Sequence, residues 1–412
     1  MSRRTTFDRI ASGKRGSAAA TPTSPEPAPA LRHSPRTRSF VDTHSLVFWV
    51  FMILSAYGLI QVTPLLLRGM QTYPAAGMLA VILWSLYALA FVFVVYKLEL
   101  FERRSPVTIL GALMWGSLVC AGIGVVAAPA MHGIAASWLG EDSPWIAAVS
   151  APLVEEPLKM LGVVALALIP GARVRSAADG LFYGAIIGLG FMVVESYLYT
   201  MQAAVASGGN FDTVFQLVIL RGVVSGLWSH ATLTAIAGAG VGYFFNSTRG
   251  PGVRWGVMLG GLGVAMLLHA FFDSPVLDTN VYAATFAKGI PVFVMLLVVL
   301  RVVHKRERSI LAHLARDTVP DHLVSPLDFA LLSNRTIRTH VRTSARRSLG
   351  LSGALAMRQL QQSQLALLSA AHEDGMDSER ADEATEHVLA AQAALAQLRA
   401  DAAGQPATSS PR

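Results

Sequence analysis

Long apolar stretches separated by short polar segments occupy the middle of the chain. An apolar stretch of about 20 residues spans the hydrocarbon core of a bilayer as a helix, because each residue adds about 1.5 Å along the helix axis. The pattern therefore predicts an all-α, polytopic membrane bundle of about eight transmembrane helices. Their expected limits are residues 45–66, 75–96, 106–128, 145–169, 178–201, 214–245, 255–273 and 283–303. The sixth is longer than a span requires, and we interpret it as a tilted helix or one that extends past the membrane.

The two ends of the chain differ from its middle. Residues 1–43 are basic and rich in Ser, Thr, Pro and Ala, without the early apolar stretch of a signal peptide, and we expect a disordered tail. The membrane domain is predicted at 44–304. Residues 305–412 are polar, with apolar residues at helical spacing in 352–371 and 378–400, which predicts a helical or partly disordered second tail. This tail is a candidate binding site for a partner protein or a second copy.

Composition agrees with a membrane protein. The chain is 53% hydrophobic and 14% charged, whereas soluble proteins carry roughly 25% charged residues. The net charge of +7 does not indicate a nucleic-acid partner, because the basic residues lie between the apolar stretches and in the flanks. The only cysteine, Cys120, excludes an internal disulfide and a cysteine metal cluster.

Basic residues cluster in alternate loops. They occur before the first stretch and near residues 97–104, 173–175, 249–254 and 301–308. The intervening loops carry only Arg68 and Lys288. Because basic loops stay in the cytoplasm, we predict a multi-pass protein of the cell membrane with both termini cytoplasmic.

Two adjacent carboxylates in the fourth stretch are the strongest candidates for chemistry. A charged side chain at the bilayer centre costs about 2.5 kcal/mol or more, so it rarely occurs without a role. Glu155 and Glu156 are followed one turn later by Lys159, which can neutralise either one. The pair is suited to take a proton from a water and return it. The alternative is a structural ion pair around Lys159.

Three later stretches carry further ionisable residues. Glu195 lies in the fifth, His230 in the sixth, and His269 and Asp273 share one face of the seventh. Asp273 is placed to orient the ring of His269. Arg221 is either a partner for a carboxylate or an interface residue. Any of them alone can be a structural group, but all fall in the central-to-outer half of the predicted membrane, which predicts one buried reaction centre.

This centre has two possible forms. Glu195, His230 and His269 can hold a divalent metal such as zinc with a position open for water. Alternatively, they stabilise an oxyanion without a metal, while Glu155 or Glu156 activates the water. The usual His-Glu-x-x-His zinc motif is absent from the sequence, and the residues by themselves leave both forms open.

The order of three motifs resembles the PrsW family of intramembrane proteases. The motifs are Glu155-Glu156-x-x-Lys159, Phe191-x-x-x-Glu195 and His269-x-x-x-Asp273. His230 is similar to the histidine on the intervening span of that family. A more distant similarity is to the CAAX-processing proteases, which usually carry Glu-Glu-x-x-x-Arg; Met160 stands at the arginine position here and favours the PrsW reading.

The resemblance implies hydrolysis of a peptide bond in a membrane-anchored protein, and a known substrate in that family is an anti-sigma factor cut on its outer side. Glu155, Glu156, Glu195, His230 and His269 would be catalytic, supported by Lys159 and Asp273. The main alternative is a proton-coupled transporter or channel that uses the same buried groups. No inverted repeat is visible in the sequence, and the polar residues cluster at one depth, which favours the protease. A scaffold that recruits partners through its second tail is a third possibility.

Overall fold

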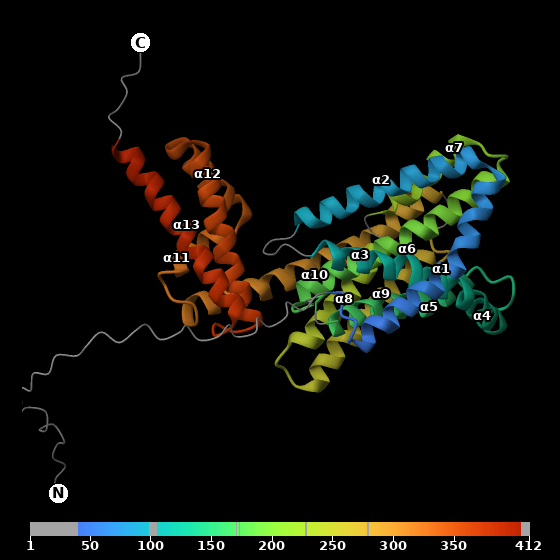
Figure 1. The fold of residues 1–412 in the computed structure, drawn as a ribbon. Coiled ribbons are helices and arrows are strands. Elements are labelled where there is room, and N and C mark those ends of the chain that lie inside the picture. The colour runs from blue at the N-terminus through green and yellow to red at the C-terminus, as the bar shows by residue number, and fades with distance from the viewer. Residues whose placement is uncertain are drawn as a thin grey trace, which may run out of the picture. The chain divides into compact units, whose positions relative to one another are not determined.

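The computed structural model describes residues 40–98, 105–169, 171–172, 174–226, 229–277 and 280–404. Every regular element within these residues is a helix, so the predicted all-α class is confirmed (Figure 1). Most of the disordered tail predicted for residues 1–43 lies outside the described residues.

Six helices in the described part of the chain are long and apolar enough to cross a membrane. They are α1 (Leu46–Thr72), α2 (Pro74–Leu98), the continuous run of α3 (Pro106–Met114), η1 (Trp115–Cys120) and α4 (Ala121–Leu139), α6 (Ala177–Ala206), α9 (Pro251–Asp273) and α10 (Val281–Asp317). The fourth predicted stretch forms α5 (Ile146–Leu168), which has spanning length but carries charged residues. The chain is therefore a multi-pass membrane protein, as its hydropathy pattern predicts.

The sixth predicted stretch is divided into parts, so its interpretation as one long helix is wrong. α7 (Phe211–Val218) continues into a π-helical turn, η2 (Ile219–Val224), and α8 (His230–Asn246) begins after a break. Gly226 lets the chain pass the phenol of Tyr87, because a Cβ there would lie 2.3 Å from Tyr87 Oη. The break makes His230 the first residue of a helix instead of a residue in its middle.

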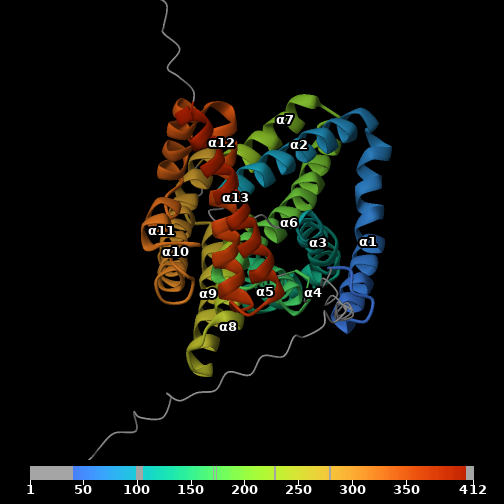
Figure 2. The ribbon, with the colours of Figure 1, turned by 60° about the vertical axis from the view of Figure 1, so that its left-hand side comes forward.

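α6 is the central helix of the membrane bundle and contacts α8, α2, α5 and η1. Figure 2 shows α6 within the bundle and α1 at its edge. A Cβ on Gly180 would lie 2.0 Å from the carbonyl oxygen of Gly238, and a Cβ on Gly188 would lie 2.3 Å from that of His230. Small residues let helix backbones approach closely in lipid. The contact between α6 and α8 thus fixes the start of α8 against α6.

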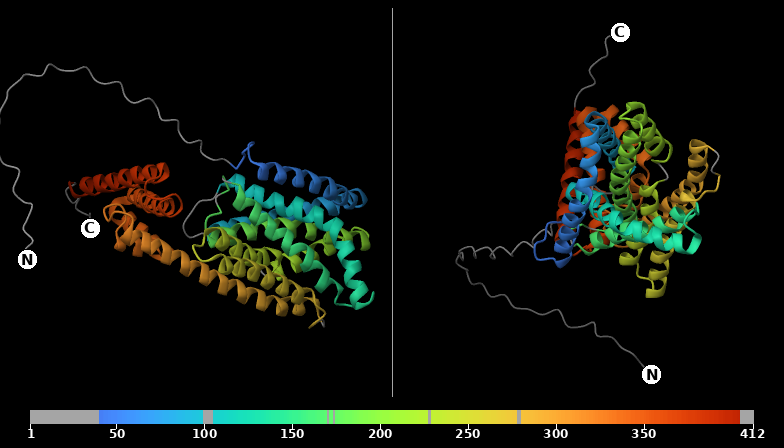
Figure 3. Two further views of the ribbon diagram at one scale, coloured as in Figure 1. Left: turned by 90° about the horizontal axis from the view of Figure 1, so that it is seen from below. Right: turned by 90° about the vertical axis from the view of Figure 1, so that its right-hand side faces the viewer.

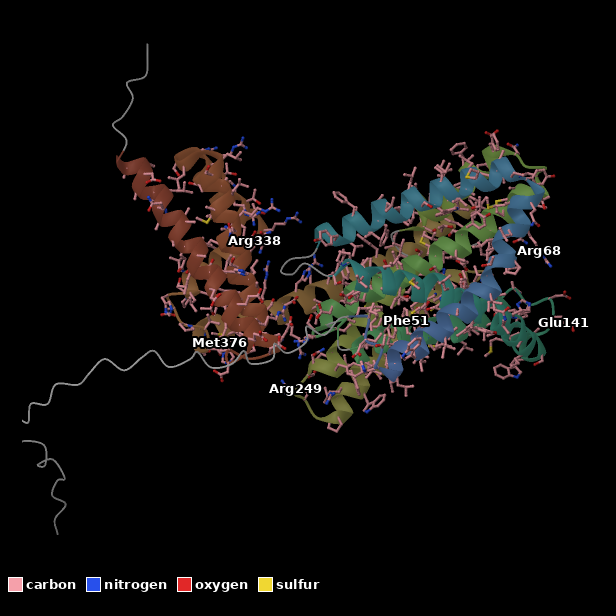
Figure 4. The ribbon with its side chains drawn as sticks, viewed as in Figure 1. Phe51, Arg68, Glu141, Arg249, Arg338 and Met376 are labelled. Carbon is pink, nitrogen blue, oxygen red and sulfur yellow. The ribbon has the colours of Figure 1, made fainter. Side chains whose placement is uncertain are left out.

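The ends of the bundle follow the alternation expected from the loops. Figure 4 shows Arg249 toward one end of the bundle and Arg68 and Glu141 toward the other. Arg249 belongs to a loop predicted to be cytoplasmic, whereas the loops of Arg68 and Glu141 are predicted to lie outside. Which end faces the cytoplasm, and hence the side of the termini, stays a prediction.

The second tail is helical and has its own apolar core. α10 extends as one long helix toward α11 (Pro326–Leu332), α12 (Arg335–Glu373) and α13 (Glu379–Gly404) (Figure 3). α12 reverses at Gly350, whose φ of 69° favours glycine. Leu365, Leu368 and Val388 belong to the buried cluster between these helices. The apolar residues predicted at 352–371 and 378–400 therefore bury one another to a large extent.

We predict that Gly180→Val destabilises the protein, because its new side chain collides with the backbone of α8 and not with a flexible side chain. Overpacking of this kind typically costs about 1–3 kcal/mol, which a lower Tm of the detergent-purified protein would report. Gly256→Val is the matched control, since nothing lies within 4 Å of a Cβ at that position. An equal loss in both variants would contradict the packing argument.

Candidate functional site

Four helices bring the predicted polar residues together. α5 supplies a carboxylate pair and a lysine, α6 supplies one carboxylate, and α8 and α9 each supply a histidine. The residues are Glu155, Glu156, Lys159, Glu195, His230, His269 and Asp273. Each lies within hydrogen-bonding or ion-pair distance of another member, so all of them belong to one connected network.

Lys159 is the centre of this network. Its Nζ donates to Glu155 Oε2 and Glu156 Oε1 at 2.9 Å each, and to His230 Nδ1 at 2.8 Å. An ammonium group can only donate, so His230 accepts at Nδ1 and presents Nε2–H to Glu195 Oε2, 3.0 Å away. Lys159 and Glu156 are both fully buried. The lysine therefore sets the tautomer of His230, a role that the sequence did not predict.

His269 is held on both sides of its ring. Nδ1 lies 2.9 Å from Glu156 Oε1, and Nε2 lies 3.2 Å from Asp273 Oδ2. The position of Asp273 is compatible with the predicted orienting role. Just after Asp273, the carbonyl oxygen of Ser274 accepts a hydrogen bond from the buried Lys288 of α10. This bond holds the end of α9, and with it both members of the motif.

Arg221 is the partner of Glu195. It lies in the π-helical turn η2, donates through Nη2 to Glu195 Oε2 and through Nε to Ser196 Oγ, the latter at 3.0 Å. Its guanidinium also lies 4.4 Å from the ring centroid of Tyr199. The sequence allowed two roles for Arg221, a carboxylate partner or an interface residue, and the structure shows the first. The position of an arginine inside a predicted span is the sequence signal that could have assigned Arg221 to the site.

Phe191, the first residue of the second motif, covers the network. Lys159 Nζ lies 4.2 Å from its ring centroid, and the ring of His230 packs edge-on against it at 5.0 Å. The rings of His230 and His269 are 5.1 Å apart. Phe191 thus packs against both the Lys159 ammonium and the His230 imidazole. Because Phe191 and Glu195 are four residues apart, they lie on one face of α6.

The donor set fits a divalent metal ion. Glu155, Glu156, His230 and His269 each offer one ligand atom, and these atoms lie within 4.8 Å of one another. Glu156 Oε2 is buried without a hydrogen-bond partner in the described structure. Imidazole and carboxylate together are ligands that zinc accepts.

Glu195 is not a member of this donor group. The sequence proposed Glu195, His230 and His269 as metal ligands, and the structure brings only the two histidines together with Glu155 and Glu156. Glu195 instead lies between Arg221 and the other nitrogen of His230. The sequence could not make this distinction, because it depends on which side of His230 faces α6.

A cavity of about 620 Å³ lies beside the network. It is lined mostly by apolar residues of α2, α6, α8 and α10, together with charged residues such as Asp179 and Glu373. It reaches Gly222 and Ala231, which directly follow Arg221 and His230. None of the network residues lines it. The cavity is thus a neighbour of the site and not the site itself.

We predict that Lys159→Met strongly destabilises the protein, because it leaves two carboxylates buried beside each other. Removing one partner of a buried ion pair typically costs about 3–5 kcal/mol. The loss should be smaller when Glu155→Gln is added, and Tm in detergent measures both variants. Lys305→Met, at an exposed position of α10, is the control. An unchanged Tm for Lys159→Met would rule out the central role of the ammonium.

Comparison with known proteins supports a proteolytic function. Residues 104–302 match the model of a family described as PrsW family intramembrane metalloprotease, and all network residues lie inside this segment. No curated protein and no solved structure was found to match the chain. The more distant similarity to CAAX-processing proteases stays a hypothesis. The match over residues 104–302, in a chain with membrane-spanning helices, supports the conclusion that this protein is a peptidase.

Proposed function

We propose that this peptidase cuts membrane-anchored proteins with a water molecule activated by the glutamate pair of α5. The observation that carries the proposal is the single network formed by residues of four helices around Lys159, in which acids and imidazoles meet at one place. A purely structural ion pair would need only one carboxylate to neutralise the ammonium of Lys159. Here two acids and two histidines converge, and one oxygen of Glu156 keeps no partner in the described structure.

Glu155 is the better candidate for the general base. The side chain of Glu155 is 14% exposed, whereas that of Glu156 is fully buried and shares Oε1 between Lys159 and His269. A water can therefore reach Glu155, while Glu156 is held in the interior. The water oxygen attacks the substrate carbonyl carbon as Glu155 takes the water proton, and the carbonyl electron pair moves to oxygen. Glu155 then gives this proton to the leaving amine as the carbon–nitrogen bond breaks.

Arg221 is the candidate for stabilising the negative charge that develops on the substrate oxygen. Arg221, 26% exposed, and Glu195, 21% exposed, form the more accessible edge of the network. We propose that Arg221 stabilises the oxyanion and that Glu195 keeps it in place. His230, His269 and Glu156 would hold a divalent metal such as zinc, provided that the Lys159 ammonium, which donates to His230 Nδ1 here, releases that nitrogen. When bound, this ion supplies Lewis-acid polarisation of the water and the carbonyl.

The substrate is proposed to be a protein anchored in the same bilayer, because the network lies among membrane helices. An anti-sigma factor is one such substrate in proteases that this chain resembles. With both termini cytoplasmic, the network would lie in the outer half of the membrane and the cut would fall on the outer side.

Substitution of Glu155 is expected to abolish cleavage without loss of folding. Glu155→Gln keeps hydrogen bonding but cannot accept the water proton, so we expect a loss of about 100-fold or more in the cleavage rate of a co-expressed single-span substrate. His269→Ala should have a similar effect. Glu141→Gln, in an exposed loop, is the control.

If the Glu155→Gln and His269→Ala variants insert and still release the fragment, the assignment fails. Proton flux into vesicles that disappears in Glu195→Gln, in the absence of any cleavage, would favour the transporter instead.

Metal content gives an independent test. The purified protein should contain about one divalent metal ion per chain, and a chelator should remove both the metal and the activity. His230→Ala and His269→Ala should each lower the metal content, whereas His313→Ala, in the exposed part of α10, should not. Full activity in a metal-free preparation would mean that the network works without an ion.

A further inference from the structure

The second tail contains a strongly basic hairpin that no step of the proteolytic proposal uses. Residues 335–372 include six arginines and no acidic residue. They form the two arms of α12, which run antiparallel on either side of Gly350: Arg342 Nε donates to Gln361 Oε1 at 2.6 Å, across 19 residues of sequence. The next helix, α13, is by contrast mostly acidic in its charged residues. The positive charge is therefore concentrated on one element of the tail.

The arginines of the hairpin repel one another. Burial and then the charges of Arg342, Arg335 and Arg308 lower the pKa of Arg338, whose Nη1 donates to the carbonyl of Leu332. Burial and the neighbouring arginines likewise lower the pKa of Arg342. Crowding of like charges is unfavourable. Binding of a surface with many negative charges would relieve it.

Three arginines of the hairpin are available to such a partner. Arg346, Arg347 and Arg358 are exposed and make no ion pair within the described part of the chain. Figure 4 shows nitrogen-tipped side chains along the outside of α12 near Arg338. The acidic residues Glu373 and Asp374 at the far end of α12 are already engaged by Arg175. The tail therefore does not neutralise this surface by itself.

The bend of the hairpin also presents apolar side chains. Leu351 is 64% exposed and Leu355 is 55% exposed, next to Gly350 and to Arg346 and Arg347. Leucines beside arginines are typical of helices that lie in a membrane interface, where the apolar groups enter the lipid and the charges meet the headgroups. Binding of a nucleic-acid backbone would use the arginines but would leave these leucines in water.

The hairpin is tethered close to a bilayer. α10 is a continuous helix from the predicted eighth span to Asp317, and its basic residues Arg301, Lys305, Arg306 and Arg308 are expected at the membrane surface. The nine residues from Ser309 to Asp317 add only about 14 Å at 1.5 Å per residue. A tail fixed to this helix stays within reach of the lipid headgroups.

We propose that the α12 hairpin docks on the anionic surface of the bilayer that holds α10. Arg346, Arg347 and Arg358 meet the phosphate groups of anionic lipids, and Leu351 and Leu355 enter the interface. The lipid headgroup is the occupant, because the tether keeps the hairpin beside it. This docking does not depend on the reaction at the network. It can therefore be tested separately from the proposed protease mechanism.

The test places a reporter beside the bend in the full-length protein. Cys120 is buried and is replaced by alanine, and Ser352→Cys, at an exposed position, is labelled with an environment-sensitive fluorophore. The protein is reconstituted in nanodiscs of phosphatidylcholine, with or without phosphatidylglycerol. We expect a blue shift of emission only with phosphatidylglycerol. Salt at about 1 M should reverse most of it, since the screening length falls to about 3 Å.

Charge variants identify the residues responsible. Arg346→Gln with Arg347→Gln should remove at least half of the shift, whereas Arg399→Gln, an exposed arginine of α13, should leave it unchanged. A label at Ala390→Cys on α13 should show little shift, and circular dichroism checks that each variant keeps its helices.

Three results would overturn the proposal. They are the absence of a shift with phosphatidylglycerol, an equal shift in phosphatidylcholine alone, and a larger shift on adding duplex DNA to neutral nanodiscs. The last would identify a nucleic-acid surface instead.

Discussion

The contact of the Lys159 ammonium with two carboxylates and an imidazole is the interaction on which the site depends. A lone lysine or glutamate in a membrane interior is costly, and each member of this cluster offsets part of the cost of the others. Because Lys159 is fully buried, this compensation requires fixed geometry. The cluster therefore links α5, α6, α8 and α9 to one another.

Backbone packing supplies that fixed geometry. The glycines of α6 bring it against α8 so closely that the carbonyl oxygen of His230 lies 2.3 Å from the position of a Cβ at residue 188. The break before His230 and the π-helical turn that carries Arg221 place these two side chains beside Glu195, where both reach its Oε2. Irregular backbone inside a membrane is tolerated where it is enclosed by protein. Here it directs an arginine and a histidine to one carboxylate.

Charge has a second role outside the membrane domain. The spans contain a few ionisable residues that neutralise one another, whereas the α12 hairpin, residues 335–372, contains six arginines and no acidic residue. The first arrangement keeps its groups buried, and the second favours an external anionic surface. The same residue types thus serve an enclosed site in one region and an exposed surface in another, according to what surrounds them.

Much of this protein follows from its sequence because hydropathy and spacing are local properties. Apolar length predicted the helical membrane class, and the intervals Glu155–Lys159, Phe191–Glu195 and His269–Asp273 placed each set on one helical face. The cost of ionisable groups in lipid then identified candidates for the site, including His230. These inferences need only the helix period and the membrane as solvent.

The features that depend on how helices are rotated, and on where they end, were determined by the tertiary structure. It divided the sixth stretch near Gly226, which lies against Tyr87 of α2, a residue distant in sequence. It placed Glu155 and Glu156 beside the two histidines and paired Glu195 with Arg221. The orientation of α6 toward α8 determines which nitrogen of His230 lies near each carboxylate. It also folded the tail at Gly350 and so exposed Leu351 beside the arginines. Spacing gives the face of a helix, but only packing against other helices determines what that face meets.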